Sequence, residues 1–250
     1  MIRLIRAEFL KLRTTQVWLW LLLAAVAICV LIIIASLATK GAVTNAAQLS
    51  DVFATTNTSS LATFVLGVLG VTTEFRYQTI TPTVLATPSR WALVTAKLIA
   101  YALVGACYAL ICLVVELAIA VPWLAAKHVD YSLGDPAIRH AMAGVFVSVT
   151  LNAIIGLGAG ALMRNQIVAV TVGLLFLLVV ENIILAIPGV KNAWPYTISG
   201  ATTAILHTHG PATANNVHLV GVSLGVIILL LWAFIPAIVG AAFTLNRDIT

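Results

Sequence analysis

The stretch that decides the fold is VWLWLLLAAVAICVLIIIASL, residues 17–37, which contains no charged side chain. About 20 helical residues are enough to cross the ~30 Å hydrocarbon core of a membrane. Inside lipid the backbone must satisfy its own hydrogen bonds, so an apolar run of this length must be helical. Trp18 and Trp20 stand at its start, where aromatic rings suit the membrane–water interface. The stretch therefore predicts a transmembrane helix.

The rest of the chain repeats this pattern. Apolar residues make up 62% of the sequence and charged residues only 8%, whereas about a quarter of a soluble domain is charged. The short alternating segments of a membrane β-barrel are missing. We predict an all-α polytopic membrane protein, with residues 1–250 forming one transmembrane domain. Its six helices are expected at residues 17–38, 54–73, 89–121, 141–162, 167–187 and 217–243.

The second of these helices is the most polar. To cross the membrane it must begin near Ala54 and so include a run of Thr, Asn and Ser residues. These side chains are expected to face protein or a water-filled cavity, although a helix that starts later is the alternative. The candidate pathway residues on this helix are Thr55, Thr56, Asn57, Ser60 and Phe64. Pro122 is expected to end the third helix, and Pro236 to kink the sixth.

The first 15 residues have the pattern of an amphipathic helix at the membrane surface. Apolar residues recur at helical spacing at Ile2, Ile5, Phe9 and Leu12. The basic residues between them are Arg3, Arg6, Lys11 and Arg13. The alternative is a basic flank that only sets the orientation of the first span.

Lys and Arg are distributed unevenly between the two sides of the predicted membrane. With both termini inside, nine are cytoplasmic: Arg3, Arg6, Lys11, Arg13, Arg76, Arg90, Lys97, Arg164 and Arg247. Four are external: Lys40, Lys127, Arg139 and Lys191. The positive-inside rule therefore favours cytoplasmic termini. Because these charges stand at the ends of apolar runs, the net charge of +5 is no sign of nucleic-acid binding.

The loop from Glu74 to Arg90 carries two helix-start signals. Thr81-Pro82 and Thr87-Pro88 each place a Thr at an N-cap and a Pro at the first helical position. A short helix is therefore expected between them, with Pro82, Thr83, Val84, Leu85 and Ala86. Glu74, Arg76 and Arg90 are candidate ion-pair partners around it; their alternative role is topology and headgroup contact.

Two acidic residues lie within predicted spans, Glu116 in the third helix and Glu181 in the fifth. A carboxylate inside a membrane is costly, which makes it a functional candidate. Both lie near the expected outer boundary, where headgroups, a second subunit, Asn182 or Lys191 could also meet them. Gly156 and Gly160, in the fourth helix, form a small-xxx-small pair that permits close helix packing.

None of the common catalytic motifs is found in the sequence. There is no Gly-x-x-x-x-Gly-Lys-Ser/Thr, and no Gly-Lys pair, so a P-loop is excluded. Metalloprotease and nucleophile-elbow motifs are also missing. His207 and His209, with His218, have only a weak metal-site spacing, and solvated loop histidines are the expected alternative. We predict no metal site, no catalytic residue and no enzymatic activity in this chain.

Three features resemble the membrane (permease) subunit of type-2 ABC exporters. The first is the opening Arg-Ala-Glu-Phe-Leu-Lys-Leu-Arg-Thr-Thr, residues 6–15, before a Trp-containing span. The second is Glu-Phe-Arg-Tyr-Gln-Thr-Ile, residues 74–80, followed by Leu-Ala-Thr-Pro-Ser-Arg, residues 85–90, and then Lys97. The third is the layout of six spans with a long external segment, residues 188–216, before the last.

This resemblance implies a mechanism and partners. The segment 82–86 would be a coupling helix docked on a separate ABC ATPase dimer, which would bind ATP and Mg²⁺. A second permease copy or a close homologue would complete a pathway lined by the second and fifth helices. Residues 188–216 would hold re-entrant helices at the outer side. The expected place is the bacterial plasma membrane, and membrane lipid, but no nucleic acid, is an expected partner.

Alternatives remain for the cargo that is exported and for the energy source that drives transport. Family members export drugs, peptides, lipids and polysaccharides, and the small, apolar spans suggest a hydrophobic or amphiphilic cargo. Glu116, Glu181 and Asn182 are further pathway candidates. The competing hypothesis is a proton- or ion-coupled secondary transporter, with Glu116 and Glu181 as its titrating groups. A membrane-embedded enzyme or assembly factor is a third, but it lacks clustered catalytic residues.

Overall fold

The computed structural model describes residues 1–39, 46–78, 90–127, 132, 134–206 and 217–246. Every regular element in these residues is a helix, and six helices are long and apolar enough to cross a membrane. This confirms the predicted fold class. These candidate spans are Val17–Ala38, Ser50–Arg76, Trp91–Ala126, Pro136–Met163, Gln166–Ala186 and Val222–Gly240.

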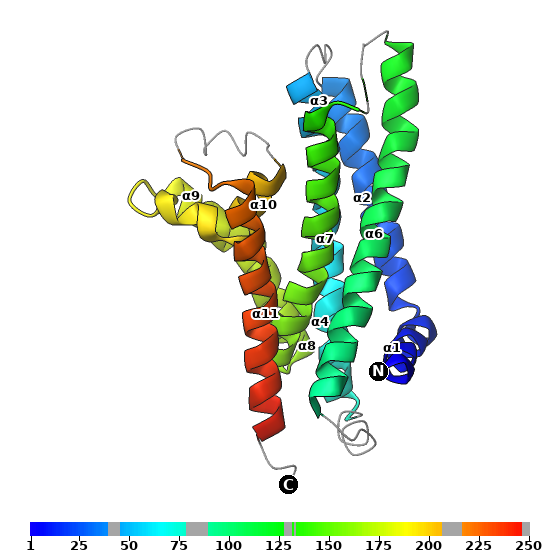
Figure 1. The fold of residues 1–250 in the computed structure, drawn as a ribbon, viewed down its shortest axis with the longest axis vertical. Coiled ribbons are helices and arrows are strands. Elements are labelled where there is room, and N and C mark those ends of the chain that lie inside the picture. Colours follow the sequence, from blue (N-terminus) through cyan, green and yellow to red (C-terminus); the bar gives the residue numbers. More distant parts are fainter. Residues whose placement is uncertain (40–45, 79–89, 128–131, 133, 207–216, 247–250) are drawn as a thin grey trace.

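The spans form an elongated bundle with its termini at one end (Figure 1). The amphipathic helix α1 (Ile2–Thr15) lies at this end, turned out of the direction of the spans, and leads into α2 (Val17–Thr39). We call this end the basal end; α4, α7 and α11 finish there, and α6 and α8 begin there. The opposite, distal end carries α3, α9 and α10.

The second span is broken into three pieces. It begins as α3 (Ala46–Ala54), passes through a tight 3₁₀ turn, η1 (Thr55–Ser59), and continues as α4 (Ser60–Arg76). The hydroxyls of Thr55 and Thr58 donate to the carbonyls of Val52 and Thr55, at 2.7 and 2.8 Å. Such local bonds compete with regular helix geometry. They accompany the change of helix type where the sequence is most polar.

The third and fourth spans are longer than expected. Helix α6 (Arg90–Ala126) continues past Pro122, so the prediction that this proline ends the helix is wrong. Helix α7 (Pro136–Met163) starts five residues before the expected Ala141, because Asp135 caps it and Pro136 fits its first position. The Asp135 carboxylate accepts from the amide of Ala137 at 2.8 Å.

The fifth and sixth spans are joined by a compact helical segment. Helix α8 (Gln166–Leu175) continues through a π-helical turn, η2 (Phe176–Val180), into α9 (Glu181–Ala186). A 3₁₀ helix, η3 (Lys191–Tyr196), and the short helix α10 (Ile198–Leu206) follow. The last span is α11 (Val222–Asn246), which begins later than the expected residue 217 and contains Pro236.

Helix α7 is the centre of the bundle and packs against α3, α4, α6, α8, α10 and α11. Its crossing with α4 is very close: a Cβ on Gly156 would lie 2.0 Å from the carbonyl oxygen of Phe64. On Gly160 it would lie 2.8 Å from the carbonyl oxygen of Val68. Because no side chain larger than hydrogen fits there, the predicted role of this glycine pair is confirmed.

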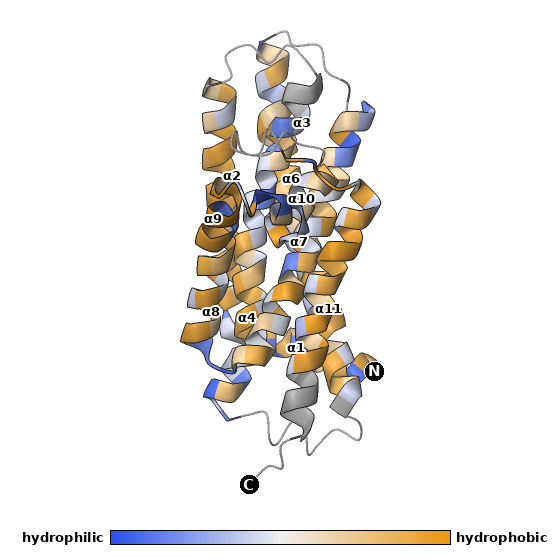
Figure 2. Cartoon of the chain, turned by 90° about the vertical axis from the view of Figure 1, so that its left-hand side faces the viewer, coloured by the Kyte–Doolittle hydropathy of each residue, from blue (hydrophilic) through white to orange (hydrophobic). Residues whose placement is uncertain are grey.

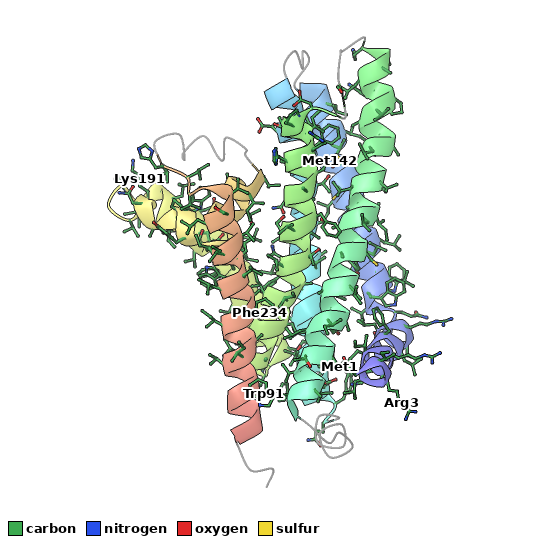
Figure 3. The ribbon with its side chains drawn as sticks, in the orientation of Figure 1. Met1, Arg3, Trp91, Met142, Lys191 and Phe234 are labelled. Atoms are coloured by element: carbon green, nitrogen blue, oxygen red, sulfur yellow. The ribbon has the colours of Figure 1, made fainter. Side chains whose placement is uncertain are left out.

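The outer surface of the bundle is apolar. Exposed large apolar side chains follow α2, α8 and α11, for example Leu31, Leu175 and Leu231. Figure 2 shows hydrophobic residues along most of the helices, and hydrophilic ones at the two ends and around α10. Figure 3 shows side chains standing out from α11, where the exposed Phe234 is labelled. A surface of this kind is stable against lipid, in agreement with the six-span architecture.

Candidate functional site

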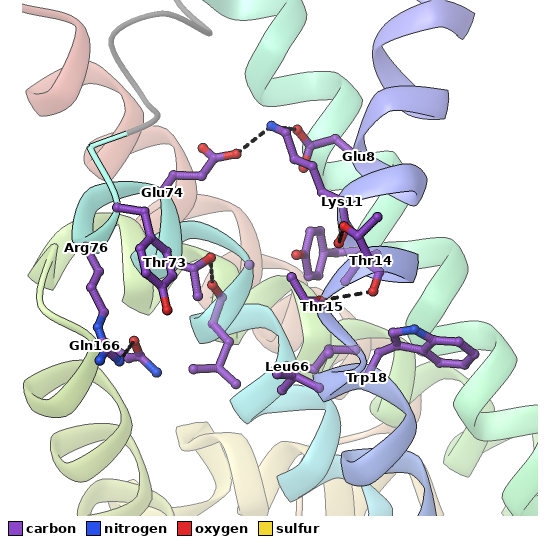
Figure 4. A pocket seen from close by; sticks show the side chains of 16 residues that line it. Glu8, Lys11, Thr14, Thr15, Trp18, Leu66, Thr73, Glu74, Arg76 and Gln166 are labelled. Atoms are coloured by element: carbon purple, nitrogen blue, oxygen red, sulfur yellow. Dashed lines mark hydrogen bonds and ion pairs between the residues drawn. The ribbon is translucent and has the colours of Figure 1, made fainter.

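Four charged side chains from three helices meet at the basal end. Glu8 and Lys11 come from α1, Glu74 from the last turn of α4, and Lys97 from the second turn of α6. Each lysine Nζ lies 2.8 Å from an oxygen of each glutamate, which gives four ion pairs. We call these residues the basal ion cluster; Figure 4 shows three of its members, Glu8, Lys11 and Glu74.

The basal ion cluster is buried. The exposed fractions of Glu8, Glu74 and Lys97 are 2%, 6% and 6%. Burying charges is costly unless they are paired and hydrogen-bonded, and here two carboxylates balance two ammonium groups. Lys11 is the most exposed member. Burial lowers its pKa, but the carboxylates of Glu74 and Glu8 raise it by more, so the pKa of Lys11 stays above its usual 10.5.

The basal ion cluster lies beside the connection between α4 and α6. Glu74 lies just before the end of α4 and Lys97 just after the start of α6, and residues 79–89 connect these helices. The cluster therefore ties both flanks of that connection to α1.

The structure changes the expected pairing of the loop residues. Glu74 pairs with Lys11 and Lys97, not with Arg76. Arg76 instead donates to Oε1 of Gln166 at 3.2 Å, and its guanidinium stands 5.7 Å from the ring centre of Tyr77. The other predicted coupling residues lie outside the described part of the structure. They are Pro82, Thr83, Val84, Leu85 and Ala86, together with the side chain of Arg90.

A pocket of about 640 Å³ opens beside the cluster (Figure 4). It lies between α1, the start of α2 and the second half of α4, with Tyr101 and Gln166 completing the wall. Glu8, Lys11 and Glu74 contribute its charged side, whereas Leu66, Leu69, Val17 and Trp18 contribute its apolar side. We call this space the basal pocket. Its mixed lining suits a ligand with one polar and one apolar part.

The residues of the predicted interfacial helix are divided between two surroundings. Ile5 and Leu12 pack against the bundle core, and Glu8 lies between them on the same helix face. Arg3, Arg6, Phe9 and Arg13 are exposed, and Lys11 is partly buried in the cluster. The inner face of α1 is therefore anchored to protein through charges as well as apolar contacts. Its contact with a membrane surface remains a prediction.

The predicted pathway residues around the helix break are mostly turned inward. Thr56, Ser60 and Phe64 are buried, and Thr55 is partly buried. Asn57 accepts a hydrogen bond from Ser148 of α7 at 2.6 Å. Phe64 packs so close to α8 that a Cβ on Gly173 would lie 2.3 Å from its ring. The broken span thus contacts the helices on either side, and its role in transport stays a prediction.

Glu116 lies beside this break. Its side chain is fully buried, and both carboxyl oxygens lack a hydrogen-bond partner among the described residues. Thr56 and Cys112 are its polar neighbours. The hydroxyls of Thr56 and Ser59 are buried without partners in the same part of the chain. Unpartnered buried groups are rare in native structures, so this place is polar and incompletely satisfied.

Glu181 has a clear structural partner. Its carboxylate accepts from the amide of Ile198 at 2.9 Å and from the amide of Ser199 at 3.1 and 3.3 Å. These amides open α10, where free N–H groups and the helix dipole favour an anion. The expected contacts with Asn182 or Lys191 are not made: Asn182 is exposed and donates to the carbonyl of Leu178. Glu181, the first residue of α9, thus fixes α10 against the last part of the fifth span.

Helix α10 packs into the bundle instead of lying loose outside it. It contacts α7 and α11, and most of its residues are buried. A Cβ on Gly144 of α7 or on Gly225 of α11 would lie 3.0 Å from a carbonyl oxygen of α10. Trp232 of α11 also donates to the carbonyl of Tyr196 at 3.0 Å. Helices η3 and α10 therefore form a structured cap at the distal end.

Sequence reasoning missed two members of the basal ion cluster as site residues. Glu8 was considered only as part of the pattern at residues 6–15. Lys97 was considered only as a cytoplasmic charge and as the end of the second pattern. A signal existed, since Glu8 lies on the apolar face formed by Ile5 and Leu12. A charge on that face needs a buried partner, and Lys97, within an apolar span, needs one as well.

A bundle of six candidate membrane spans, with a charged cluster joining an amphipathic helix to two of them, is the architecture of a polytopic membrane protein. Residues 4–180, from α1 to the π-helical turn, match the model of the ABC-2 family transporter proteins. The chain therefore belongs to this family, whose members work with an ABC ATPase. Comparison with curated proteins gives no match.

Proposed function

We propose that this chain is the permease subunit of an ATP-driven exporter. It forms the pathway as a dimer with a second copy or a close homologue, and a separate ABC ATPase dimer binds ATP and Mg²⁺. The chain itself carries no catalytic residue. It resides in a bacterial plasma membrane with both termini in the cytoplasm, and its cargo is hydrophobic or amphiphilic.

The basal ion cluster is the observation that carries this proposal. The cluster lies within the family-matched region and holds α1, α4 and α6 together at both flanks of residues 79–89. In the proposed mechanism, a coupling helix at 82–86 receives the movement of the ATPase. The cluster passes this movement on as a shift of three helices, which requires different contacts in the inward and outward states.

The distribution of charge supports the proposed orientation. Arg3, Arg6, Arg13, Arg76 and Arg164 belong to the basal end, whereas Lys127, Arg139 and Lys191 belong to the distal end. An excess of basic residues favours the cytoplasmic side. The basal end would then face the ATPase, and α10 would cap the pathway on the outer side.

The competing hypothesis of an ion-coupled secondary transporter retains one supporting observation. The unpartnered carboxyl of Glu116 is the kind of group that such transporters use. Glu181 is less suited to this role, because its carboxylate already accepts hydrogen bonds from the start of α10. Family membership favours the ATP-driven exporter.

Copurification and ATP hydrolysis test the proposal. The chain is expressed with the ABC ATPase encoded beside it, purified, and placed in lipid. We expect the ATPase to copurify and its hydrolysis rate to change on association. Replacing residues 82–86 by a Gly-Ser run of equal length should abolish both effects, whereas the same replacement at residues 211–215 should leave them intact. A permease that binds no ATPase, or is unaffected by the first replacement, would overturn the proposal.

A further inference from the structure

The basal pocket has the size of a ligand site. Its volume of about 640 Å³ lies within the range of about 300–1,000 Å³ that is typical of small-molecule sites. The charges and hydrogen bonds of its wall decide which ligand it suits. That choice depends on which acceptors and donors of the wall are already hydrogen-bonded and on where its apolar surface lies.

Three of the four carboxylate oxygens of Glu8 and Glu74 already accept hydrogen bonds from lysines. Both oxygens of Glu8 accept from a lysine, one from Lys11 and one from Lys97, each at 2.8 Å. Oε1 of Glu74 accepts from both lysines at the same distance. Because these carboxylates are neutralised, the pocket offers little attraction to a cationic ligand.

The threonine hydroxyl protons of the wall are used as well. Thr14 and Thr15 donate to the carbonyls of Lys11 and Leu12, at 2.9 and 3.0 Å. Thr73 donates to the carbonyl of Leu69 at 2.6 Å. These hydroxyls therefore give no free donor to a ligand.

The wall also holds neutral donors, the side-chain amide of Gln166 and the hydroxyl of Tyr77, but its charged donors are cationic. Lys11 has three N–H groups, of which the two carboxylates take two. Arg76 makes no ion pair within the described residues and donates only to Gln166. With Lys97 behind the wall, three cations stand against the two carboxylates of Glu8 and Glu74. The pocket therefore has one positive charge in excess and suits an anion.

The remaining wall suits hydrocarbon. Leu66, Leu69 and Val17 line the pocket, together with the ring of Trp18, whose buried N–H has no partner among the described residues. The neighbouring helix α1 exposes Ile2, Phe9 and Leu10 beside its arginines, a combination typical of a helix at a membrane surface. The source of an anion with attached hydrocarbon at such a surface is the membrane itself.

We propose that the basal pocket binds an anionic membrane phospholipid. The headgroup phosphate accepts from Arg76 and from the free N–H of Lys11, while the upper acyl chain lies along Leu66, Leu69 and Trp18. This site goes beyond permease function and is independent of ATP hydrolysis. A failure of the ATPase experiment would leave it untouched, and its own failure would leave the permease assignment untouched.

Native mass spectrometry of the purified full chain tests this site. The chain is incubated with equal amounts of phosphatidylglycerol and phosphatidylcholine that carry the same acyl chains. Both lipids carry the phosphate, but the quaternary ammonium of phosphatidylcholine adds a positive charge to a pocket that already has one in excess. We therefore expect phosphatidylglycerol to be retained about tenfold more strongly. R76Q should remove this preference. R13Q removes the same charge from the basal end outside the pocket and should keep it.

Two further arms keep the test decisive. Glycerol 3-phosphate, which carries the headgroup charge without acyl chains, should not displace the lipid. If R76Q does not fold, T73W fills the pocket without changing a charge, and it should lose the bound lipid. Equal retention of both lipids by the native chain, an equal loss in R13Q and R76Q, full displacement by glycerol 3-phosphate, or lipid retention by T73W would each overturn the proposal.

Discussion

Nζ of Lys97 lies 2.8 Å from Oε2 of Glu8, a residue 89 positions earlier in the chain. The same nitrogen lies 2.8 Å from Oε1 of Glu74 and 3.3 Å from the carbonyl oxygen of Gly70. Three of its contacts are therefore made in a buried site at the base of the bundle. The ammonium of Lys97 is the point where α1 and α4 are both attached to α6.

Removing Lys97 should strongly destabilise the protein. K97M leaves Glu8 and Glu74 buried with Lys11 alone, and an uncompensated buried charge costs about 3–5 kcal/mol. The measurement is the free energy of unfolding in mixed detergent and SDS. The double variant E8Q/K97M should recover a large part of the loss, since it removes the excess carboxylate. Equal stability of K97M and the native chain would show that the cluster does not hold the helices together.

The contribution of Lys11 should persist to high pH. Burial lowers the pKa of Lys11, but the carboxylates of Glu74 and Glu8 raise it above 10.5. A raised pKa in the folded state means stability that is present below the unfolded value and is lost as the pH rises through the folded value. The groups that face Lys11 in the cluster are Glu8 and Glu74, with Lys97 and Tyr101 nearby.

The pH test of Lys11 compares the native chain with K11M. The difference between their thermal unfolding midpoints should stay constant from pH 7 to about 10 and shrink only above about 10.5. Because lysines and tyrosines outside the cluster have the same surroundings in both proteins, their contributions cancel in this difference. A difference that vanishes near neutral pH would contradict the raised pKa.

The six spans were predictable because lipid imposes a constraint that can be recognised along the chain. Apolar length alone identifies a segment that must be helical. The breaks within the spans were less accessible. The polar run from Thr55 to Ser59 marked an unusual place, but the composition could not distinguish a 3₁₀ turn from a late helix start. Pro122 was misleading, because α6 includes it near its end.

The site was predictable only in part, since its contacts join distant positions. Glu74 and Lys11 were recognised as candidates, but neither lies near the other in the sequence. Glu181 was recognised as an acid within a span, whereas its partners are backbone amides 17 and 18 positions later. Because backbone amides are the same in almost every residue, the sequence does not show which of them will bind a carboxylate. The face of α1 that packs on protein was also hidden, because lipid and a protein core both accept apolar side chains.

Glu116 and Glu181, the two acids within the spans, should respond differently to replacement by glutamine. E116Q replaces a buried carboxyl that has no partner among the described residues by a neutral amide of similar size, so we expect unchanged or increased stability. E181Q weakens the cap of α10, which accepts from Ile198 and Ser199, and should cost about 1–2 kcal/mol. SDS unfolding compares both variants with the native chain. A greater loss in E116Q than in E181Q would reverse these assignments.

The crossing of α4 and α7 should tolerate no added methyl group. In G156A the new Cβ would meet the carbonyl oxygen of Phe64 at 2.0 Å, a backbone atom that cannot move aside alone. The helices must separate, and overpacking of this kind costs about 1–3 kcal/mol. G189A is the matched control, because a Cβ at Gly189 meets nothing within 4 Å. Thermal unfolding should show a lowered midpoint for G156A and an unchanged one for G189A; equal midpoints would mean that α4 and α7 cross less closely than the structure shows.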